Sequence, residues 1–446
     1  MTYPQAIKYL ERFVNYEKFI DYPYKRSLKL ERIKDFLSLI GNPQSYLRCI
    51  HVAGTKGKGS TCAFITYVLR EAGFRVGLYT SPHLSDFRER IRILECQKTA
   101  KPKWASKDRE AQVGVKRPRS PSGCQGAFEG MISRRGLTTL VNKLKPAIDR
   151  YNKSSEYGPL SFFEVYTALA FVYFKEQGTD FAVLETGLGG RLDATNTVKA
   201  PVSVITPISY EHTQKLGKTL RKIAKEKAGI IKGQGVRGKA VVISAPQEKE
   251  AATVIRNRCK EVGVALQEIN EPLMGIKLPL FGKHQRINAA VAVSAVRALK
   301  LGISQKIIRR GLLNTQWPGR SEVVARNPLV VLDGAQNIAS AKALKETIRS
   351  NFKYKKLILV LGISKDKDIK GICNEFYSLA DQVILTCADN PRAEDPKVLS
   401  RYFKGREYFL TGSVKEARQK AMRLAAKDDL ILGTGSLFVV GELRNV

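Results

Sequence analysis

A short run rich in glycine and lysine, Ile50–Thr61 (IHVAGTKGKGST), has the residue types that bind phosphate groups. Its three glycines let the backbone approach an anion closely, and Lys58 could lie against the β- and γ-phosphates of a nucleotide. The spacing departs from the usual G-x-x-x-x-G-K-[ST] pattern, because Val52 stands at the first glycine and Gly59 separates Lys58 from Ser60. From spacing alone, a glycine turn with surface lysines is the alternative.

Further stretches carry groups suited to metal chemistry. Ser81, in the run TSPHL, offers a hydroxyl, and Glu185 closes an apolar run just before the glycine-rich turn GLGG. Such oxygens are the ligands that Mg²⁺ prefers. His212 and Lys227 follow in the next part of the chain. The plainer interpretations are a capping serine, a solvated glutamate and a structural histidine.

Elements that could position these groups alternate along the chain. We expect strands at 47–53, 75–80, 181–185, 203–208 and 240–244, and a helix over 60–72 directly after the glycine-rich run. Strands that alternate with helices predict an α/β fold with a doubly wound, mostly parallel sheet. Ligands bind such sheets in the loops at the carboxyl ends of the strands, which is where TSPHL would lie.

A second α/β series follows the turn-like segment NTQWPGR. Before this segment, helices are expected over 278–301 and 303–313. After it, strands are expected at 329–333, 356–363, 382–387 and 430–432, which puts a domain boundary close to Arg320. Segment 96–126 is basic and almost without apolar periodicity, so it predicts a disordered surface insertion. A nucleic-acid or targeting role for its KRPR run is the alternative.

Composition narrows the class of protein. The 446 residues include 76 Lys and Arg against 41 Asp and Glu, a formal charge of +35. This excess favours anionic partners, or else a solvated basic surface. The seven cysteines form no C-x-x-C pair, which argues against a zinc ribbon and fits a reducing compartment. Because no signal peptide or long apolar run is present, we expect a soluble cytoplasmic protein that does not enter a membrane.

Eight motifs occur in an order that resembles the folylpolyglutamate synthase/dihydrofolate synthase family of the Mur ligase superfamily. They span nearly the whole chain apart from segment 96–126, and they read HVAGTKGKGS, TSPHLSDFRERIRI, LETGLGGRLDATN, EHTQKLGKTLRKIAKEKAGIIKG, FGKHQRINAA, WPGR, LDGAQN and GTGSLFVVGE. The resemblance implies an N-terminal P-loop ATPase domain, here 1–315, and a smaller Rossmann-like C-terminal domain, here 321–446. It implies ATP bound between the domains, and a monomer.

The implied reaction is that of an ATP-dependent acid–amino-acid ligase of folate biosynthesis and one-carbon metabolism. ATP would phosphorylate a carboxylate of dihydropteroate or of a folate tail, and the amine of L-glutamate would attack the acyl phosphate. The family also contains enzymes that only extend tails, and the run LDATN favours the bifunctional branch. The expected partners are these small molecules, with no specific nucleic acid.

The resemblance also implies roles for individual residues. Lys58, His212 and Lys227 would be catalytic, and two Mg²⁺ ions would use Ser81, Glu185, His212 and a carbamoylated Lys227. The ATP contacts would be Gly54, Thr55, Gly57, Lys58, Gly59, Ser60, Asn288, Arg320 and Asp333. The pterin pocket would use Ser161, Phe162, Phe163 and Leu192, with an aromatic stacking surface.

This chain departs from the family pattern at several positions. Glu211 stands for the commoner aspartate before His212, and Ile338 for a proline. In DGAQN, Gln336 replaces a histidine, and glutamine cannot carry charge at neutral pH, which predicts reduced activity. A Mur-type peptidoglycan ligase is the nearest rival, but about 50 residues before the loop are too few for its extra domain. An ATP-dependent nucleic-acid binder would require a basic stripe with interleaved aromatics, which is not evident.

Overall fold

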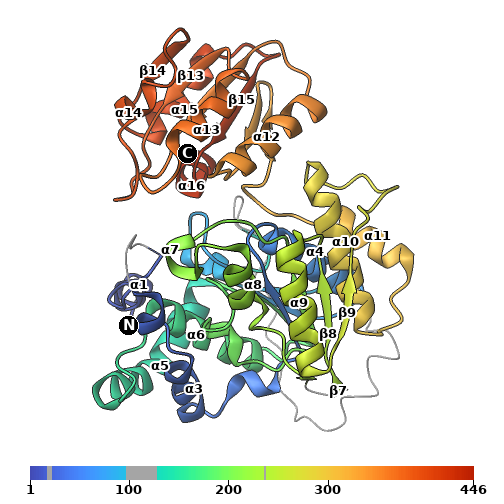
Figure 1. Cartoon of the computed structure of the whole chain (residues 1–446). Helices are drawn as coiled ribbons and strands as arrows, with labels where there is room; N and C mark the ends of the chain where they lie inside the picture. The colour runs from blue at the N-terminus through green and yellow to red at the C-terminus, as the bar shows by residue number, and fades with distance from the viewer. Residues whose placement is uncertain (18–22, 97–127, 236–237, 446) are drawn as a thin grey trace. The chain divides into compact units, whose positions relative to one another are not determined.

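The computed structural model of the chain describes residues 1–17, 23–96, 128–235 and 238–445. The expected insertion at 96–126 lies outside the described residues, except for Cys96. The chain forms two compact units (Figure 1). The first comprises 1–83, 87–277 and 286–315, and the second comprises 84–86, 278–285 and 316–446. Two short segments of the N-terminal sequence therefore group with the second unit.

The first unit is built on a sheet of seven strands in the order β3-β2-β4-β1-β5-β8-β9. All neighbours pair in parallel except β2 and β3, which are antiparallel. The central strands are buried along their whole length, as expected for a parallel sheet that helices flank. The strands are β1 (Cys49–Ala53), β2 (Val76–Tyr79), β3 (Ile91–Leu94), β4 (Phe181–Glu185), β5 (Val202–Ile205), β8 (Val241–Ser244) and β9 (Ala265–Glu268).

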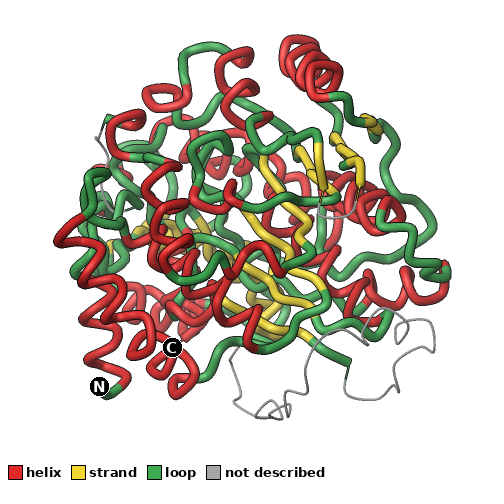
Figure 2. Tube along the Cα trace, turned by 90° about the horizontal axis from the view of Figure 1, so that it is seen from below, coloured by secondary structure: helices red, strands yellow, loops and turns green. Residues whose placement is uncertain are grey.

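Helices flank this sheet, and Figure 2 shows them around the strands from below. Helix α4 (Lys58–Glu71) packs on β1, β2 and β4, and α11 (Gln305–Leu313) packs on α4. Another core cluster joins α1, α3, α5 and α6 to the strands. The remaining helices of the first unit are α1 (Tyr3–Glu11), α2 (Tyr24–Ser27), α3 (Leu30–Leu39), α5 (Arg134–Ser154), α6 (Phe162–Glu176), α7 (Thr213–Leu216), α8 (Leu220–Ala228) and α9 (Lys249–Val262), and α10 (Lys283–Ala298) begins in the second unit.

The second unit has a sheet of six strands in the order β10-β11-β15-β12-β13-β14. It is parallel except for the hairpin of β10 and β11. Its strands are β10 (Glu322–Arg326), β11 (Leu329–Leu332), β12 (Leu357–Leu361), β13 (Gln382–Leu385), β14 (Glu407–Leu410) and β15 (Leu430–Thr434). Its helices are α12 (Ile338–Asn351), α13 (Ile369–Tyr377), α14 (Pro396–Ser400), α15 (Val414–Leu424) and α16 (Leu437–Asn445).

The predicted α/β fold with mostly parallel sheets is confirmed. The helix expected from residue 278 begins at Lys283, because Gly282 has a φ of 108° that a helix cannot contain. Strands β9, β10 and β14 were not predicted, since they are short and largely exposed, so their sequences show little apolar pattern. In the part of the chain that is described, no helix is both long and apolar enough to cross a membrane.

Candidate active site

Four neighbouring strands bring the predicted site residues to one edge of the first sheet. The order of these strands in the sheet is β2-β4-β1-β5. Strand β2 leads into the run TSPHL, and β4 ends at Glu185 before the glycine-rich turn. Strand β1 leads into the phosphate-binding loop, and β5 leads into the segment that ends at His212. Because all four strands are parallel, their carboxyl ends lie at the same edge. This edge is the candidate active site.

The predicted phosphate-binding loop joins β1 directly to α4. Gly57 precedes the helix in the left-handed conformation, with a φ of 80°. A Cβ on Gly57 would lie 2.4 Å from Oδ1 of Asn288, so this glycine keeps the predicted ATP contact Asn288 against the loop. Gly54, at a φ of 151°, leaves room for Thr206, whose Oγ1 would be 1.9 Å from an added Cβ. These glycines are therefore required by close approach as well as by backbone conformation.

The loop presents its backbone donors at the helix start. The N–H groups of Thr55 and Lys56 donate to the carbonyl of Pro207, at 3.0 and 3.2 Å, which ties the first half of the loop to the segment after β5. Helix α4 begins at Lys58 and has no acidic residue in its first turn. First-turn N–H groups have no partner within a helix, and they favour an anion. The geometry therefore suits a phosphate group at Gly57–Ser60.

Glu185 ends β4 beside this loop. One of its oxygens, Oε1, lies 4.0 Å from Nζ of Lys58. The other, Oε2, accepts a hydrogen bond from the backbone N–H of Ser81 at 3.3 Å. The Glu185 carboxylate is 6 % exposed, so it sits in a low-dielectric environment where a nearby cation matters most. The structure thus brings Lys58, Ser81 and Glu185 together from three different strand ends.

Lys227 reaches the same loop from α8. Its side chain is buried, and Nζ donates to the backbone carbonyl of Gly54 at 2.7 Å. Burial lowers the pKa of Lys227 to about 7, and the positive charge of Lys58 adds to the shift. Near neutral pH a large fraction of this amine is therefore uncharged.

His212 lies at the start of α7 in an exposed position. It adopts the left-handed conformation with a φ of 52°, which is uncommon for a residue other than glycine. Across the residues that the structure describes, no three His, Cys, Asp or Glu side chains gather as a metal site. Ser81 and Glu185 are in contact through the backbone N–H of Ser81, and the metal roles of Ser81, Glu185 and His212 stay predictions.

His51 and the run LDATN form a buried network behind the site. Oδ1 of Asp193 accepts hydrogen bonds from the N–H and the hydroxyl of Thr195, and Oδ2 accepts from the N–H of Leu188 at 2.9 Å. Because the Thr195 hydroxyl donates to Asp193, the 2.8 Å contact to His51 requires Nε2 of His51 to donate. Burial lowers the pKa of His51 to about 3, so this histidine is neutral and structural.

Three of the four predicted pterin residues, Ser161, Phe162 and Phe163, lie at the start of α6. Ser161 caps this helix, and its hydroxyl donates to Glu164 at 2.7 Å. Phe162 is buried in the core, whereas Phe163 is partly exposed and its ring would lie 2.7 Å from a Cβ on Gly187. Leu192 is partly buried against the cluster that includes α8 and α9. This geometry favours Phe163 over Phe162 as a stacking surface beside the glycine-rich turn.

The second unit holds the other two predicted ATP contacts. Arg320 and Asp333 lie next to each other, since the N–H of Gly334 donates to the carbonyl of Gly319 at 3.0 Å. Oδ2 of Asp333 accepts from the backbone N–H of Ser321 at 2.7 Å and from its hydroxyl at 3.1 Å. Asp333 is therefore held in a fixed orientation.

An ion pair that also contacts His83 of the run TSPHL was not predicted. Arg90 is fully buried, and its guanidinium pairs with both carboxylate oxygens of Glu17. Its Nε donates to Nδ1 of His83 at 2.9 Å, so the proton of a neutral His83 sits on Nε2. The motif FRERIRI contains Arg90, but no local pattern links it to Glu17, which lies 73 residues away.

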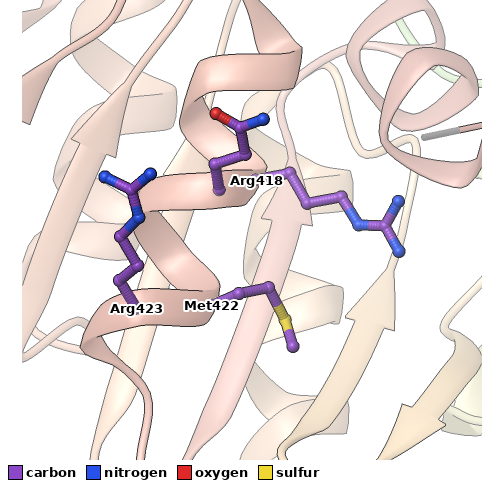
Figure 3. Close-up of a pocket in the computed structure, with 4 residues that line it drawn as sticks. Arg418, Met422 and Arg423 are labelled. Atoms are coloured by element: carbon purple, nitrogen blue, oxygen red, sulfur yellow. The ribbon is translucent and has the colours of Figure 1, made fainter.

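A shallow hollow on α15 is lined by none of the predicted site residues. Arg418, Gln419, Met422 and Arg423 line it. Figure 3 shows Arg418 and Met422, which are four residues apart, extending to the same side of the helix. Because no predicted catalytic or ligand-binding residue lines this hollow, the strand-end edge of the first unit remains the candidate site.

Comparison with known proteins places this arrangement in a family. The Mur ligase middle domain matches residues 162–265, and the Mur ligase glutamate ligase domain matches residues 319–437. The dihydrofolate synthase/folylpolyglutamate synthase of Bacillus subtilis is 32 % identical over 443 residues, covering 93 % of this chain and 94 % of that protein. The chain belongs to the folylpolyglutamate synthase/dihydrofolate synthase family of Mur ligases.

Other relatives in this family differ in length or have known structures. A probable bifunctional folylpolyglutamate synthase/dihydropteroate synthase of Haloferax volcanii is 36 % identical over 93 % of this chain, but the chain spans only 48 % of that protein. The folylpolyglutamate synthase of Mycobacterium tuberculosis complexed with ADP and AMPPCP has a TM-score of 0.81 and 28 % identity, covering 99 % of this chain and 97 % of that one. E. coli FolC in complex with DHPP and ADP has a TM-score of 0.77 and 28 % identity, covering 100 % and 97 %.

Proposed function

We propose that this chain uses ATP to join L-glutamate to dihydropteroate and to the polyglutamate tails of folates. The observation that carries the proposal is the meeting of Lys58, Glu185 and Ser81 beside the glycine-rich loop. Family membership supplies the substrate class. The substrates are highly anionic, so part of the +35 charge would attract them to the protein.

The proposed reaction has two steps. A carboxylate oxygen of the pterin substrate attacks the γ-phosphorus of ATP and ADP leaves, which forms an acyl phosphate. The glutamate amine then attacks the acyl carbon, a proton leaves the nitrogen, and phosphate departs from the tetrahedral intermediate. Lys58 and the N–H groups at the start of α4 stabilise charge on the moving phosphoryl group. Phe163 and the turn at Gly187 orient the pterin end.

Glu185 and Ser81, which are in contact through the Ser81 backbone N–H, carry the oxygen ligands that a magnesium ion takes. Mg²⁺ takes few protein ligands and completes its octahedron with water and phosphate oxygens. One carboxylate and one hydroxyl beside a phosphate-binding loop match that preference. When bound, the ion would neutralise charge on the ATP phosphates. A second ion at His212 and a carbamoylated Lys227 is part of the same proposal.

A ligation assay tests the proposed function directly. Purified protein is mixed with ATP, Mg²⁺ and L-glutamate, with dihydropteroate in one reaction and tetrahydrofolate in another. The products are identified by mass spectrometry. We expect one glutamate added to each. Addition only to tetrahydrofolate would restrict the enzyme to tail extension, and addition to neither would refute the proposal.

Lys227 should form a carbamate with dissolved CO₂. The neutral amine attacks CO₂ and releases a proton, and one N–H remains to donate to Gly54. Because the pKa of Lys227 is lowered to about 7, the reactive form dominates above that pH and is lost as pH falls through it. With ¹³C-bicarbonate, we expect a carbamate NMR signal at pH 8 that fades below pH 7.

A matched pair of variants assigns that signal. Lys227→Arg should remove it, whereas Lys225→Arg on the exposed side of α8 should keep it. When bicarbonate is depleted, the ligation activity of the wild-type protein should fall together with its carbamate NMR signal. A pH 8 spectrum without a carbamate resonance in saturating bicarbonate would contradict the prediction.

We also infer that the protein acts in the cytoplasm, where ATP and folates are available. The six described cysteines are unpaired, which supports a reducing compartment.

A further inference from the structure

Four cations lie side by side on the segment that leads into α8. Lys218 is in the turn before the helix, and Arg221, Lys222 and Lys225 are on the helix itself. All four side chains are exposed. Among the residues that the structure describes, none of these side chains makes a hydrogen bond or an ion pair. We call these four residues the α8 cation ridge.

The stability of α8 does not explain the ridge. Arg221 and Lys225 are four residues apart on one face, and like charges at this spacing destabilise a helix. The first turn holds two cations and no acidic residue, which is the less favourable arrangement at the positive end of the helix dipole. The stem of Lys222 packs where a Cβ on Gly217 would be, 2.6 Å from the Lys222 Cβ, so its position is constrained.

The ridge adjoins the candidate active site through α8. The opposite side of the helix buries Lys227, which bonds to Gly54 of the phosphate-binding loop. The nearest acidic residue on the helix, Glu226, does not neutralise the ridge, because it pairs with Arg191 at 2.9 Å and accepts from Tyr24 at 3.3 Å. Figure 1 shows α7 and α8 next to each other, and the two helices are in contact.

We propose that the ridge binds the free carboxylates of the internal glutamates in a growing polyglutamate tail. The proposal rests on the proposed function and specifies which substrates the site prefers. Each internal glutamate that is linked through its γ-carboxyl keeps its α-carboxylate, so the tail gains one negative charge per residue. Dihydropteroate has no such charges. The kcat/KM should therefore be higher for long tails than for short ones, and the kcat/KM for dihydropteroate should not depend on the ridge.

The kinetic test replaces the four ridge residues with glutamine (K218Q/R221Q/K222Q/K225Q). kcat/KM is measured for dihydropteroate and for tetrahydrofolate with one, three and five glutamates. Several exposed ion pairs of modest strength together give an expected loss of about tenfold with five glutamates. The loss should shrink with shorter tails and vanish with dihydropteroate. An equal loss for all substrates, or none, would overturn the ridge proposal while ligation itself continued.

A control variant removes the same charge elsewhere in the first unit. Lys8 on α1 and Arg135, Arg150 and Lys153 on α5 are exposed, and among the described residues their side chains make no ion pair. Replacing these four with glutamine should leave the preference for tail length unchanged. If this variant lost the preference equally, net charge and not the ridge would be responsible.

Direct binding separates the ridge from catalysis. Free γ-linked pentaglutamate is titrated into the wild-type protein and the ridge variant at several salt concentrations. We expect binding to the wild type that weakens with salt and is reduced about tenfold in the variant. Equal binding by both proteins, or equal affinity of the ridge for single-stranded DNA of the same charge, would refute a tail-specific surface.

Discussion

Replacing Lys58 with methionine should lower kcat/KM for ligation by about 10³-fold. Lys58 starts α4 in the phosphate-binding loop, with Nζ 4.0 Å from the buried Glu185 carboxylate. Methionine keeps most of the side-chain volume but removes the cation that stabilises charge on the transferring phosphoryl group. Single charged contacts to a transferring phosphoryl group are worth effects of this size.

Lys56→Met is the matched control for Lys58→Met. Lys56 lies in the same loop and is also partly exposed, but its backbone N–H is bonded to Pro207 and the predicted ATP contacts do not include it. We expect its kcat/KM to stay within about tenfold of the wild type. Both variants should unfold at similar temperatures. Comparable activity losses in the two variants would show that Lys58 has no special role.

The second large effect is expected from Glu185→Gln, with a loss of about 10²-fold to 10³-fold in kcat. Glutamine has the same shape and can still accept from the backbone N–H of Ser81, so the loop should keep its position. The charge that would hold Mg²⁺ is lost. The Mg²⁺ concentration for half-maximal activity should therefore rise, which a loss of structure alone would not produce.

Glu226→Gln is the control for the magnesium effect. This carboxylate pairs with Arg191 on the outer side of the same unit and has no contact with Lys58. Its Mg²⁺ dependence should match the wild type. An unaltered Mg²⁺ titration in Glu185→Gln would rule out Glu185 as a ligand of the ion.

The parts of the site that depend on local pattern could be predicted from the sequence. The phosphate-binding loop is a strand, a glycine-rich turn and a helix within a few residues, and β1 and α4 form where expected. The approach of Glu185 to Lys58 follows from a general rule, because parallel strands end at one edge of the sheet. The antiparallel edge strands β3 and β10 do not follow from that rule, and their pairing is visible only in the structure.

Contacts between distant segments could not be predicted. Glu17 and Arg90 pair across 73 residues without a local signal. His51 illustrates the opposite problem, because a scarce histidine next to a phosphate-binding loop suggests chemistry. The structure shows instead that burial keeps it neutral, while its Nε2 contacts the Thr195 hydroxyl. Likewise, residue type alone did not distinguish Phe162 from Phe163, since the distinction lies in which ring the core covers.

The interleaved makeup of the two units has a consequence for dissecting the gene. Residues 84–86 and 278–285 belong to the second unit, although both lie well before the main body of that unit begins at Gln316. A carboxy-terminal fragment that starts at Gln316 would therefore lack these two segments, which pack as part of the second unit. Leu84 is one example, since its carbonyl lies 2.2 Å from where a Cβ on Gly441 would be. Neither unit can therefore be exchanged between proteins at a single junction. A chimeric enzyme must exchange residues 84–86 and 278–285 together with the carboxy-terminal sequence.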